Sequence, residues 1–328
     1  MKLGILGAGS IAGVMAKTVR LLNQNGHPEI ELYAVAARQA DRAEAFARAN
    51  GVQRAYGGYE AMLADPAVDL VYIATPHSHH YGQIRMCVAY GKHVLCEKAF
   101  TVNARQAEVA LREARDRGLL VTEAIWTRYQ PMRRRIREVV ESGEIGTPRL
   151  LTANLGYYNA QVPRIARPEL VGGALLDMGV YPLNFAEMVF DHPDGVQGVC
   201  TKNELGVDMT DNITLTWADG RAAHLTAAAT GISDRLGVIY GTAGTLVVDN
   251  INNPEGLRVY DADHRLVRRE SRPPQLTGYE YELLEAADCI ARGLTECPSM
   301  PHRETLHIMA EMDCLRAQMA VRYPCESL

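Results

Sequence analysis

The chain has 328 residues, of which 47% are hydrophobic and 22% are charged, and its formal net charge is −5. This composition is typical of a globular protein with two domains, or three at most, and excludes a disordered chain. The small negative charge gives no general attraction to nucleic acid or anionic lipid, and no apolar run is long enough to cross a membrane. We therefore expect neither a nucleic-acid nor a membrane partner.

Seven cysteines are scattered along the chain, and none belongs to a C-x-x-C pair. An odd number of unclustered cysteines favours free thiols in a reducing cytoplasm and argues against a structural zinc site. The N-terminal apolar run, residues 3–8, is short and already accounts for a first strand and turn, so we expect no signal peptide.

The first 125 residues alternate short apolar runs with helical patterns. Ile11, Met15, Val19 and Leu22 recur at helical spacing, and further helices are predicted over residues 79–90 and 103–117, the latter capped by Asn103. The predicted strands cover residues 2–6, 31–37, 55–56, 70–74, 93–96 and 119–124. This order predicts a doubly wound parallel sheet, the Rossmann fold, over residues 1–124.

From residue 149 onward the pattern changes to alternating runs. Strands are predicted over residues 150–157, 212–217, 222–228, 237–240 and 245–248, with Asp219-Gly220 as a hairpin turn. Helices are predicted over residues 173–190, 279–292 and 302–319. We therefore expect residues 125–328 to form an α+β domain with a large, mostly antiparallel open sheet.

A glycine-rich turn, Gly7-Ala8-Gly9-Ser10-Ile11-Ala12, connects the first strand to the first helix. In this position Gly7 permits the tight turn, Gly9 lets a pyrophosphate approach the backbone, and Ala12 allows helix and strand to pack closely. Ser10 and Ile11 complete the predicted cofactor-binding turn. A purely structural glycine turn is the alternative.

The second strand ends in Ala36-Ala37-Arg38, where an NAD-selective site usually has an acidic residue. The Arg38 guanidinium can pair with a 2′-phosphate, so we expect a preference for NADP, with NAD as a possible cofactor. A solvated surface arginine is the alternative interpretation.

Several further motifs resemble the Gfo/Idh/MocA oxidoreductases, particularly members that oxidise dihydrodiols or xylose with NADP. The motifs lie in family order over residues 1 to 190, at residues 34–38, 55–60, 73–77, 91–98, 123–128 and 172–182. The resemblance implies that the cofactor is contacted by a set of loop and strand-end residues: Thr75, Pro76, His77, His80, Glu97, Lys98, Trp126 and Arg128. Trp126 and Arg128 could instead serve interdomain packing.

The resemblance also implies that residues 125–328 bind the substrate and form the dimer, and it implies the catalytic groups. The family's E-K-P motif falls on Glu97-Lys98-Ala99, so the lysine is kept and the proline, which often forms a cis turn, is replaced. Asp177 and Tyr181 are four residues apart and project from one helical face. We expect Tyr181 to be the general acid/base, Lys98 to assist it, and Asp177 to position a substrate hydroxyl. A buried structural tyrosine beside a capping aspartate is the alternative.

Together these residues predict an NADP-dependent oxidoreductase that transfers hydride between the nicotinamide and a sugar, cyclic polyol or dihydrodiol-type alcohol. The histidine cluster at His77, His79 and His80 lacks a nearby acidic or cysteine partner in the sequence, so we expect no metal ion. A homodimer through the C-terminal sheet is expected, because an open sheet needs cover on its free face. Two alternatives stay open: a non-catalytic NADP(H) sensor of the same fold, and a reductase for an imine or tetrapyrrole.

Overall fold

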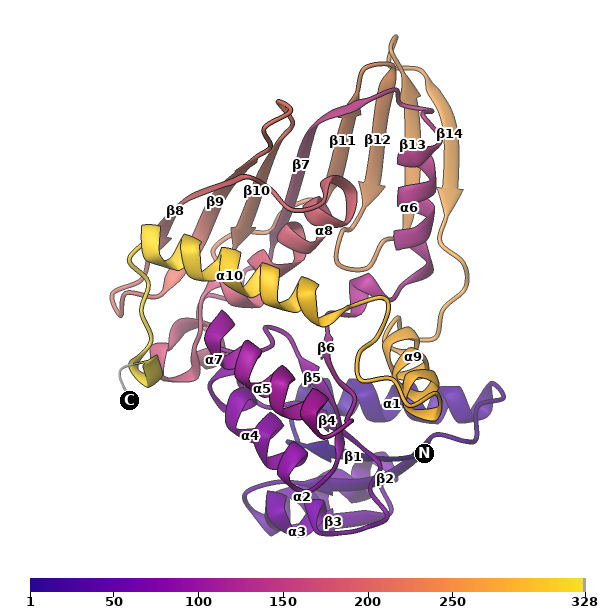
Figure 1. Ribbon diagram of the computed structural model, residues 1–328, viewed down its shortest axis with the longest axis vertical. Coiled ribbons are helices and arrows are strands. Elements are labelled where there is room, and N and C mark those ends of the chain that lie inside the picture. The colour runs from indigo at the N-terminus through magenta and orange to yellow at the C-terminus, as the bar shows by residue number, and fades with distance from the viewer. Residues whose placement is uncertain (327–328) are drawn as a thin grey trace. The chain divides into compact units, whose positions relative to one another are not determined.

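The computed structural model describes residues 1–326 and divides into two compact units (Figure 1). The first unit contains Met1–Tyr129 and Gln275–Leu306. The second contains Gln130–Pro274 and the described residues from His307 onward. The chain thus leaves the first unit, returns to it for one segment, and ends in the second.

The first unit is built on a six-stranded parallel sheet with the order β3-β2-β1-β4-β5-β6. Its strands are β1 (Lys2–Leu6), β2 (Glu31–Ala36), β3 (Arg54–Tyr56), β4 (Leu70–Ile73), β5 (His93–Glu97) and β6 (Val121–Ala124). The strand order reverses between β1 and β4, and dinucleotides bind at the carboxyl ends of the strands at such a reversal. The predicted Rossmann sheet is confirmed.

Helices cover both faces of this sheet, because right-handed crossovers place α1 and α2 on one face and α4 and α5 on the other. The helices are α1 (Ser10–Gln24), α2 (Ala40–Asn50), α3 (Tyr59–Leu63), α4 (His77–Ala89), α5 (Ala104–Asp116), η1 (Trp126–Arg128) and α9 (Glu280–Ala291). The late helix α9 contacts α1 and β5 (Figure 1). Met15, Val19 and Leu22 of α1 are buried, as their spacing predicts, and Asn103 caps α5.

The second unit is built on an eight-stranded sheet with the order β14-β13-β12-β11-β7-β10-β9-β8. Its strands are β7 (Pro148–Gly156), β8 (Gly195–Lys202), β9 (Asp208–Thr216), β10 (Ala222–Ala228), β11 (Gly237–Gly241), β12 (Gly244–Asp249), β13 (Gly256–Asp261) and β14 (Leu266–Ser271). All neighbouring strands of this sheet pair in antiparallel orientation, except that β7 and β10 pair with each other in parallel. The expected mostly antiparallel sheet is confirmed, including the hairpin turn at Asp219-Gly220 between β9 and β10.

Helices cover one face of this larger sheet. They are α6 (Pro131–Glu141), α7 (Pro163–Ala166), α8 (Val180–Phe190) and α10 (His302–Gln318), with short segments η2 (Pro168–Leu170), η3 (Leu175–Gly179) and η4 (Pro324–Glu326). Helix α8 packs on β7 and β10, and α6 packs on α8 (Figure 1). Ile213 and Leu215 of β9 are buried, whereas Asn212 before them and Thr216 after them are exposed. The sheet therefore has one apolar, covered face and one polar face.

Three strands were not expected from the sequence. Strands β8 and β14 form the two edges of the sheet, and their apolar side chains at Val199 and Leu266 are exposed, so they lack the buried alternation that marks a strand. Strand β13 follows Asn253-Pro254, which breaks the pattern of β12. The predicted helix over residues 173–190 also begins differently, because its first turn, η3, is a π-helix.

No helix in the described part of the chain is both long and apolar enough to span a bilayer. All seven cysteines are free, as expected, and four of them are buried: Cys87, Cys96, Cys289 and Cys297.

Candidate active site

The glycine-rich turn lies between β1 and α1, at the reversal of the first sheet. Gly7 has φ of +102°, and a Cβ there would lie 2.8 Å from the carbonyl oxygen of Ala74, so only glycine fits. Gly9 is the N-cap of α1, and a Cβ at Gly9 would meet no atom of residues 1–326 within 4 Å. No described side chain caps α1. The exposed amides of this helix end therefore fit a pyrophosphate group.

Arg38 follows β2 and is exposed at the carboxyl edge of the sheet. The Arg38 charge reaches His79 in the first turn of α4, because burial and then this charge lower the pKa of His79. The end of β2 thus lies near the start of α4, where the Arg38 guanidinium suits an anionic group.

The loop from β4 into α4 is held by hydrogen bonds to the backbone. His80 is completely buried, and its two ring nitrogens lie 2.8 Å from the carbonyl oxygen of Thr75 and 2.9 Å from that of Ala99. The Nε2 atom of His77 lies 3.1 Å from the carbonyl oxygen of Lys98. Burial lowers the pKa of His80 to about 4. The densest histidine cluster of the sequence therefore ties the end of β4 to the end of β5.

Lys98 directly follows β5, at the same edge of the sheet. The peptide bond between Lys98 and Ala99 is cis, so the turn associated with the family's proline forms here with alanine. The next amide, that of Phe100, donates a hydrogen bond of 3.1 Å to Glu123 of β6. Lys98 is thus carried by a backbone segment that is fixed on both sides.

Three buried side chains that the sequence analysis did not identify surround this edge. Tyr72 of β4 donates a hydrogen bond to Glu97. Glu282 of α9 is completely buried, and burial together with the nearby charge of Glu97 raises its pKa well above the usual range. Burial also raises the pKa of Glu123 to about 7, while hydrogen bonds from Thr305 and Phe100 and the charges of Arg128 and Lys98 lower it. A glutamate that closely follows the apolar run Leu119-Leu120-Val121 is the sequence signal that marks Glu123.

Replacing Glu123 with glutamine should flatten the pH dependence of stability. The pKa of Glu123 rises on folding from 4.5 to about 7, so its contribution is fully present below pH 4.5 and is lost as the pH rises through about 7. That loss is on the order of 3 kcal/mol in the free energy of unfolding. Urea unfolding at a series of pH values from 4.5 to 8 measures the slope of the free energy of unfolding against pH.

The matched control is Glu113→Gln on the surface of α5. Hydrogen bonding to Arg85 lowers the pKa of Glu113, so this carboxylate stabilises the folded state above pH 4.5 and loses that contribution as the pH falls. The control therefore leaves the slope between pH 5 and 8 in place. An unchanged slope in Glu123→Gln would contradict the prediction.

Trp126 and Arg128 lie in η1, directly after β6. The Trp126 ring stacks on Tyr279, with ring centroids 4.2 Å apart, and Gly278 leaves the space that the indole needs. Arg128 is 2% exposed and forms an ion pair of 3.3 Å with Glu304. Both side chains are therefore held within the first unit.

Asp177 and Tyr181 belong to the second unit, on the helical segment formed by η3 and α8. Two adjacent glycines start this segment: Gly172 approaches the carbonyl oxygen of Ile165, and a Cβ at Gly173 would lie 2.3 Å from Asp208. The Asp208 carboxylate accepts a 2.7 Å hydrogen bond from the amide of Leu175. The helical segment is thus anchored to β9. Its first turn is π-helical, a geometry that is frequent at functional sites.

Both candidate side chains on this segment are buried, with Asp177 6% exposed and Tyr181 7% exposed. Asp177 forms an ion pair of 2.6 Å with Arg164, which lies on the short helix α7. This contact fixes the carboxylate and connects it to the loop around residues 159–168.

A Rossmann sheet whose glycine-rich first turn exposes the amides of α1 is the architecture of a dinucleotide-binding protein. Residues 1–125 match the family model described as the Gfo/Idh/MocA oxidoreductase family, NAD-binding Rossmann fold. Residues 133–247 match the model of the GFO/IDH/MocA C-terminal domain. The chain belongs to the Gfo/Idh/MocA family, which confirms the resemblance noted in the sequence.

Full-length relatives are also found. Trans-1,2-dihydrobenzene-1,2-diol dehydrogenase from Sus scrofa is 34% identical, over 99% of this chain and 98% of the relative. A crystal structure of KijD10, a 3-ketoreductase from Actinomadura kijaniata in complex with NADP and TDP-benzene, has a TM-score of 0.85 and 25% identity, and the match covers 97% of this chain and 98% of that one. The aldose-aldose oxidoreductase from Caulobacter crescentus shares the fold, with a TM-score of 0.84, 20% identity and coverage of 98% and 97%.

Proposed function

We propose that this protein is an NADP-dependent dehydrogenase or reductase acting on the CH–OH group of a sugar, cyclic polyol or dihydrodiol. The observation that carries the proposal is the anchored helical segment of the second unit, which holds a buried tyrosine and a buried, oriented aspartate in a chain that also has a dinucleotide-binding turn. The full-length similarity to dihydrodiol dehydrogenases supports the substrate class. Dinucleotide binding is assigned to the first unit, and substrate binding to the second.

In the proposed mechanism, Tyr181 moves the proton of the reacting hydroxyl. During oxidation the Tyr181 oxygen accepts this proton, and during reduction it returns the proton to the carbonyl oxygen. The Lys98 ammonium stabilises negative charge on the substrate oxygen and favours the deprotonated form of the tyrosine. Asp177, oriented by Arg164, accepts a hydrogen bond from a second hydroxyl of the substrate. The nicotinamide, when bound, supplies or accepts the hydride.

Residues of the first unit are assigned to the cofactor. Gly7, Gly9, Ser10, Ile11 and Ala12 would hold the pyrophosphate at the start of α1. The remaining contacts are assigned to Arg38, Thr75, Pro76, His77, His80, Glu97, Lys98, Trp126 and Arg128. His77 and His80 support the loops through their backbone contacts, whereas Thr75 and Pro76 lie where the loop leaves β4.

The Arg38→Ala variant should lose its preference for NADP. Removing a charge-assisted hydrogen bond to the 2′-phosphate should raise the KM for NADP by roughly 10- to 100-fold and leave the KM for NAD within about two-fold. Steady-state kinetics with each cofactor measure this ratio. Arg48→Ala, an exposed arginine further along α2, is the control. A wild-type enzyme that prefers NAD would remove the assignment of Arg38.

The substrate class is tested by incubating the protein with NADP⁺ and a panel of aldoses, inositols and diols while the absorbance of the reduced cofactor is followed. We expect turnover with at least one member of the panel. Tight NADP(H) binding without any turnover would favour the alternative of a non-catalytic sensor. Turnover confined to NADPH with an imine or tetrapyrrole would favour the third candidate.

We also propose a homodimer formed through the polar face of the eight-stranded sheet. Thr152, Val238 and Val247 lie side by side on β7, β11 and β12 and are only partly covered. A second copy would cover this face. Light scattering should give twice the chain mass of 36.1 kDa, and a monomer at micromolar concentration would overturn the proposal. The free thiols favour a cytoplasmic location, which cell fractionation can test.

A further inference from the structure

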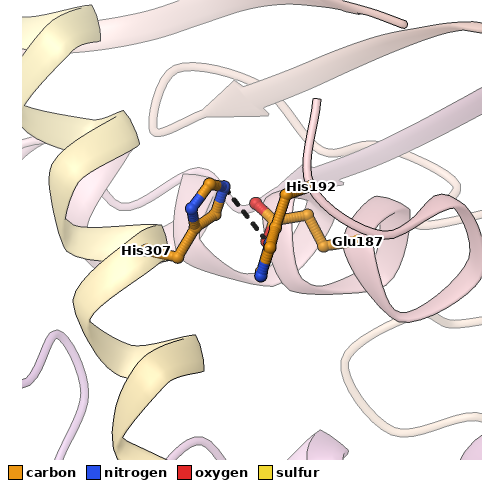
Figure 2. Close-up of side chains that lie close together, drawn as sticks. All are labelled: Glu187, His192 and His307. Carbon is orange, nitrogen blue, oxygen red and sulfur yellow. Dashed lines mark hydrogen bonds and ion pairs between the residues drawn. The ribbon is translucent and has the colours of Figure 1, made fainter. Parts of the chain in front are cut away.

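A cluster of two histidines and two glutamates lies in the second unit, apart from Asp177 and Tyr181 in the sequence. Glu187 belongs to α8, His192 follows the end of that helix, and His307 belongs to α10 (Figure 2). One ligand atom from each of these three residues lies within 4.8 Å of the others. The sequence analysis, which considered only the cluster at residues 77–80, did not identify this group.

The distances in the cluster fit the edges of a small coordination sphere. His192 Nδ1 lies 3.0 Å and His307 Nε2 lies 3.8 Å from the same oxygen of Glu187, Oε2. Glu311, one turn further along α10, places Oε1 3.2 Å from His307 Nε2. For Zn²⁺ with ligands at 2.0–2.1 Å, the edges of a tetrahedron are about 3.3 Å long. The two distances to Glu187, 3.0 Å from His192 and 3.8 Å from His307, lie on either side of this value.

Burial and charge also favour a cation. The Glu187 side chain is completely buried, and Glu311 is 5% exposed. The only hydrogen-bond or ion-pair partner of Glu311 among the described residues is His307, and its second oxygen, Oε2, is buried without a hydrogen bond. Two buried carboxylates beside two imidazoles provide oxygen and nitrogen donor atoms of the kind that a divalent ion binds. The half-exposed His192 leaves an entry path from solvent.

We propose that Glu187, His192 and His307 form a Zn²⁺ site, with a solvent molecule as the fourth ligand and Glu311 beside His307. Nitrogen and carboxylate oxygen ligands in tetrahedral arrangement are those that Zn²⁺ prefers. Because Glu187 lies on α8 and both His307 and Glu311 lie on α10, the ion joins two helices that are remote in sequence. It also stabilises the end of the helix that carries Tyr181. The site is independent of the proposed catalytic role.

Zinc binding to the full-length protein tests the proposal. After treatment with EDTA and removal of the chelator, isothermal titration with Zn²⁺ and elemental analysis should give one ion per chain, and the ion should raise the Tm. His192→Ala and His307→Ala should each weaken binding by more than about 100-fold, beyond the effect typical of an outer-shell partner. They should also abolish the rise in Tm. His224→Ala, on the exposed face of β10, should bind like the wild type.

Two further measurements separate this site from other outcomes. Co²⁺ should give the absorption of a tetrahedral nitrogen and oxygen site, without the thiolate band that binding to the free cysteines would produce. Equal Tm values for the EDTA-treated wild type and variants show that the variants fold. The proposal is wrong if the wild type binds no zinc at one ion per chain, or if both histidine variants keep wild-type affinity.

Discussion

Replacing Tyr181 with phenylalanine should lower kcat by roughly 10²- to 10⁴-fold, the range typical of losing a general acid/base. The proton of the substrate hydroxyl then has no acceptor, whereas the ring remains and continues to fill the same buried space. We therefore expect a folded variant whose free energy of unfolding is within about 1.5 kcal/mol of the wild type, and an unchanged Kd for NADP. Stopped-flow measurement of cofactor reduction, together with fluorescence titration of the cofactor, separates the chemical step from binding.

The control for this variant is Tyr90→Phe, which removes a hydroxyl from an exposed tyrosine at the end of α4. Its kinetics should equal those of the wild type. Wild-type turnover by Tyr181→Phe would remove this residue from the mechanism. Unchanged pH dependence of kcat in a slow Tyr181→Phe variant would indicate a structural role only.

Replacing Lys98 with methionine should reduce kcat/KM by roughly 10²- to 10³-fold, the effect typical of removing one group that stabilises charge in the transition state. The methylene part of the side chain is retained, so the packing around the turn after β5 is preserved. A second result is independent of activity. Because the Lys98 charge lowers the pKa of Glu123, its removal should raise that pKa further and extend the pH-dependent loss of stability to higher pH.

Lys17→Met is the control, because Lys17 is exposed on α1. This control variant should alter neither the kinetics nor the pH at which stability is lost. Wild-type activity in Lys98→Met would exclude a catalytic role for the lysine. A shifted stability profile with unchanged kinetics would show that Lys98 acts only on the buried carboxyl.

The parallel sheet of the first unit could be predicted from the sequence because its signals are local, whereas the return of Gln275–Leu306 to this unit could not. The apolar strands, the helical spacing in α1 and the glycine pattern at the first turn are each contained within a short stretch of the chain. The edge strands β8 and β14 could not be predicted, since exposed side chains at Val199 and Leu266 carry no burial pattern. The parallel pairing of β7 with β10 depends on strands far apart in the chain.

In the candidate site, too, local features could be predicted from the sequence and long-range contacts could not. The motifs containing Lys98, Asp177 and Tyr181 are continuous in sequence, whereas their supporting residues are not. Glu282 comes from α9, and Asp208 reaches the amide of Leu175 from a strand that follows it in the chain. The cluster of Glu187, His192 and His307 likewise forms only when α8 and α10 come together.

Helix α9 has a consequence for how the polypeptide matures on the ribosome. Thr18 of α1 hydrogen-bonds to Thr277, and Glu280 accepts bonds from the amides of Leu276, Thr277 and Gly278, so this late segment completes the first unit. Until it has been translated, apolar surface on α1 and β5 stays uncovered. An N-terminal fragment that stops before residue 275 would be a poor stand-alone module, and nascent chains should need chaperone protection until residues 275–306 have been translated.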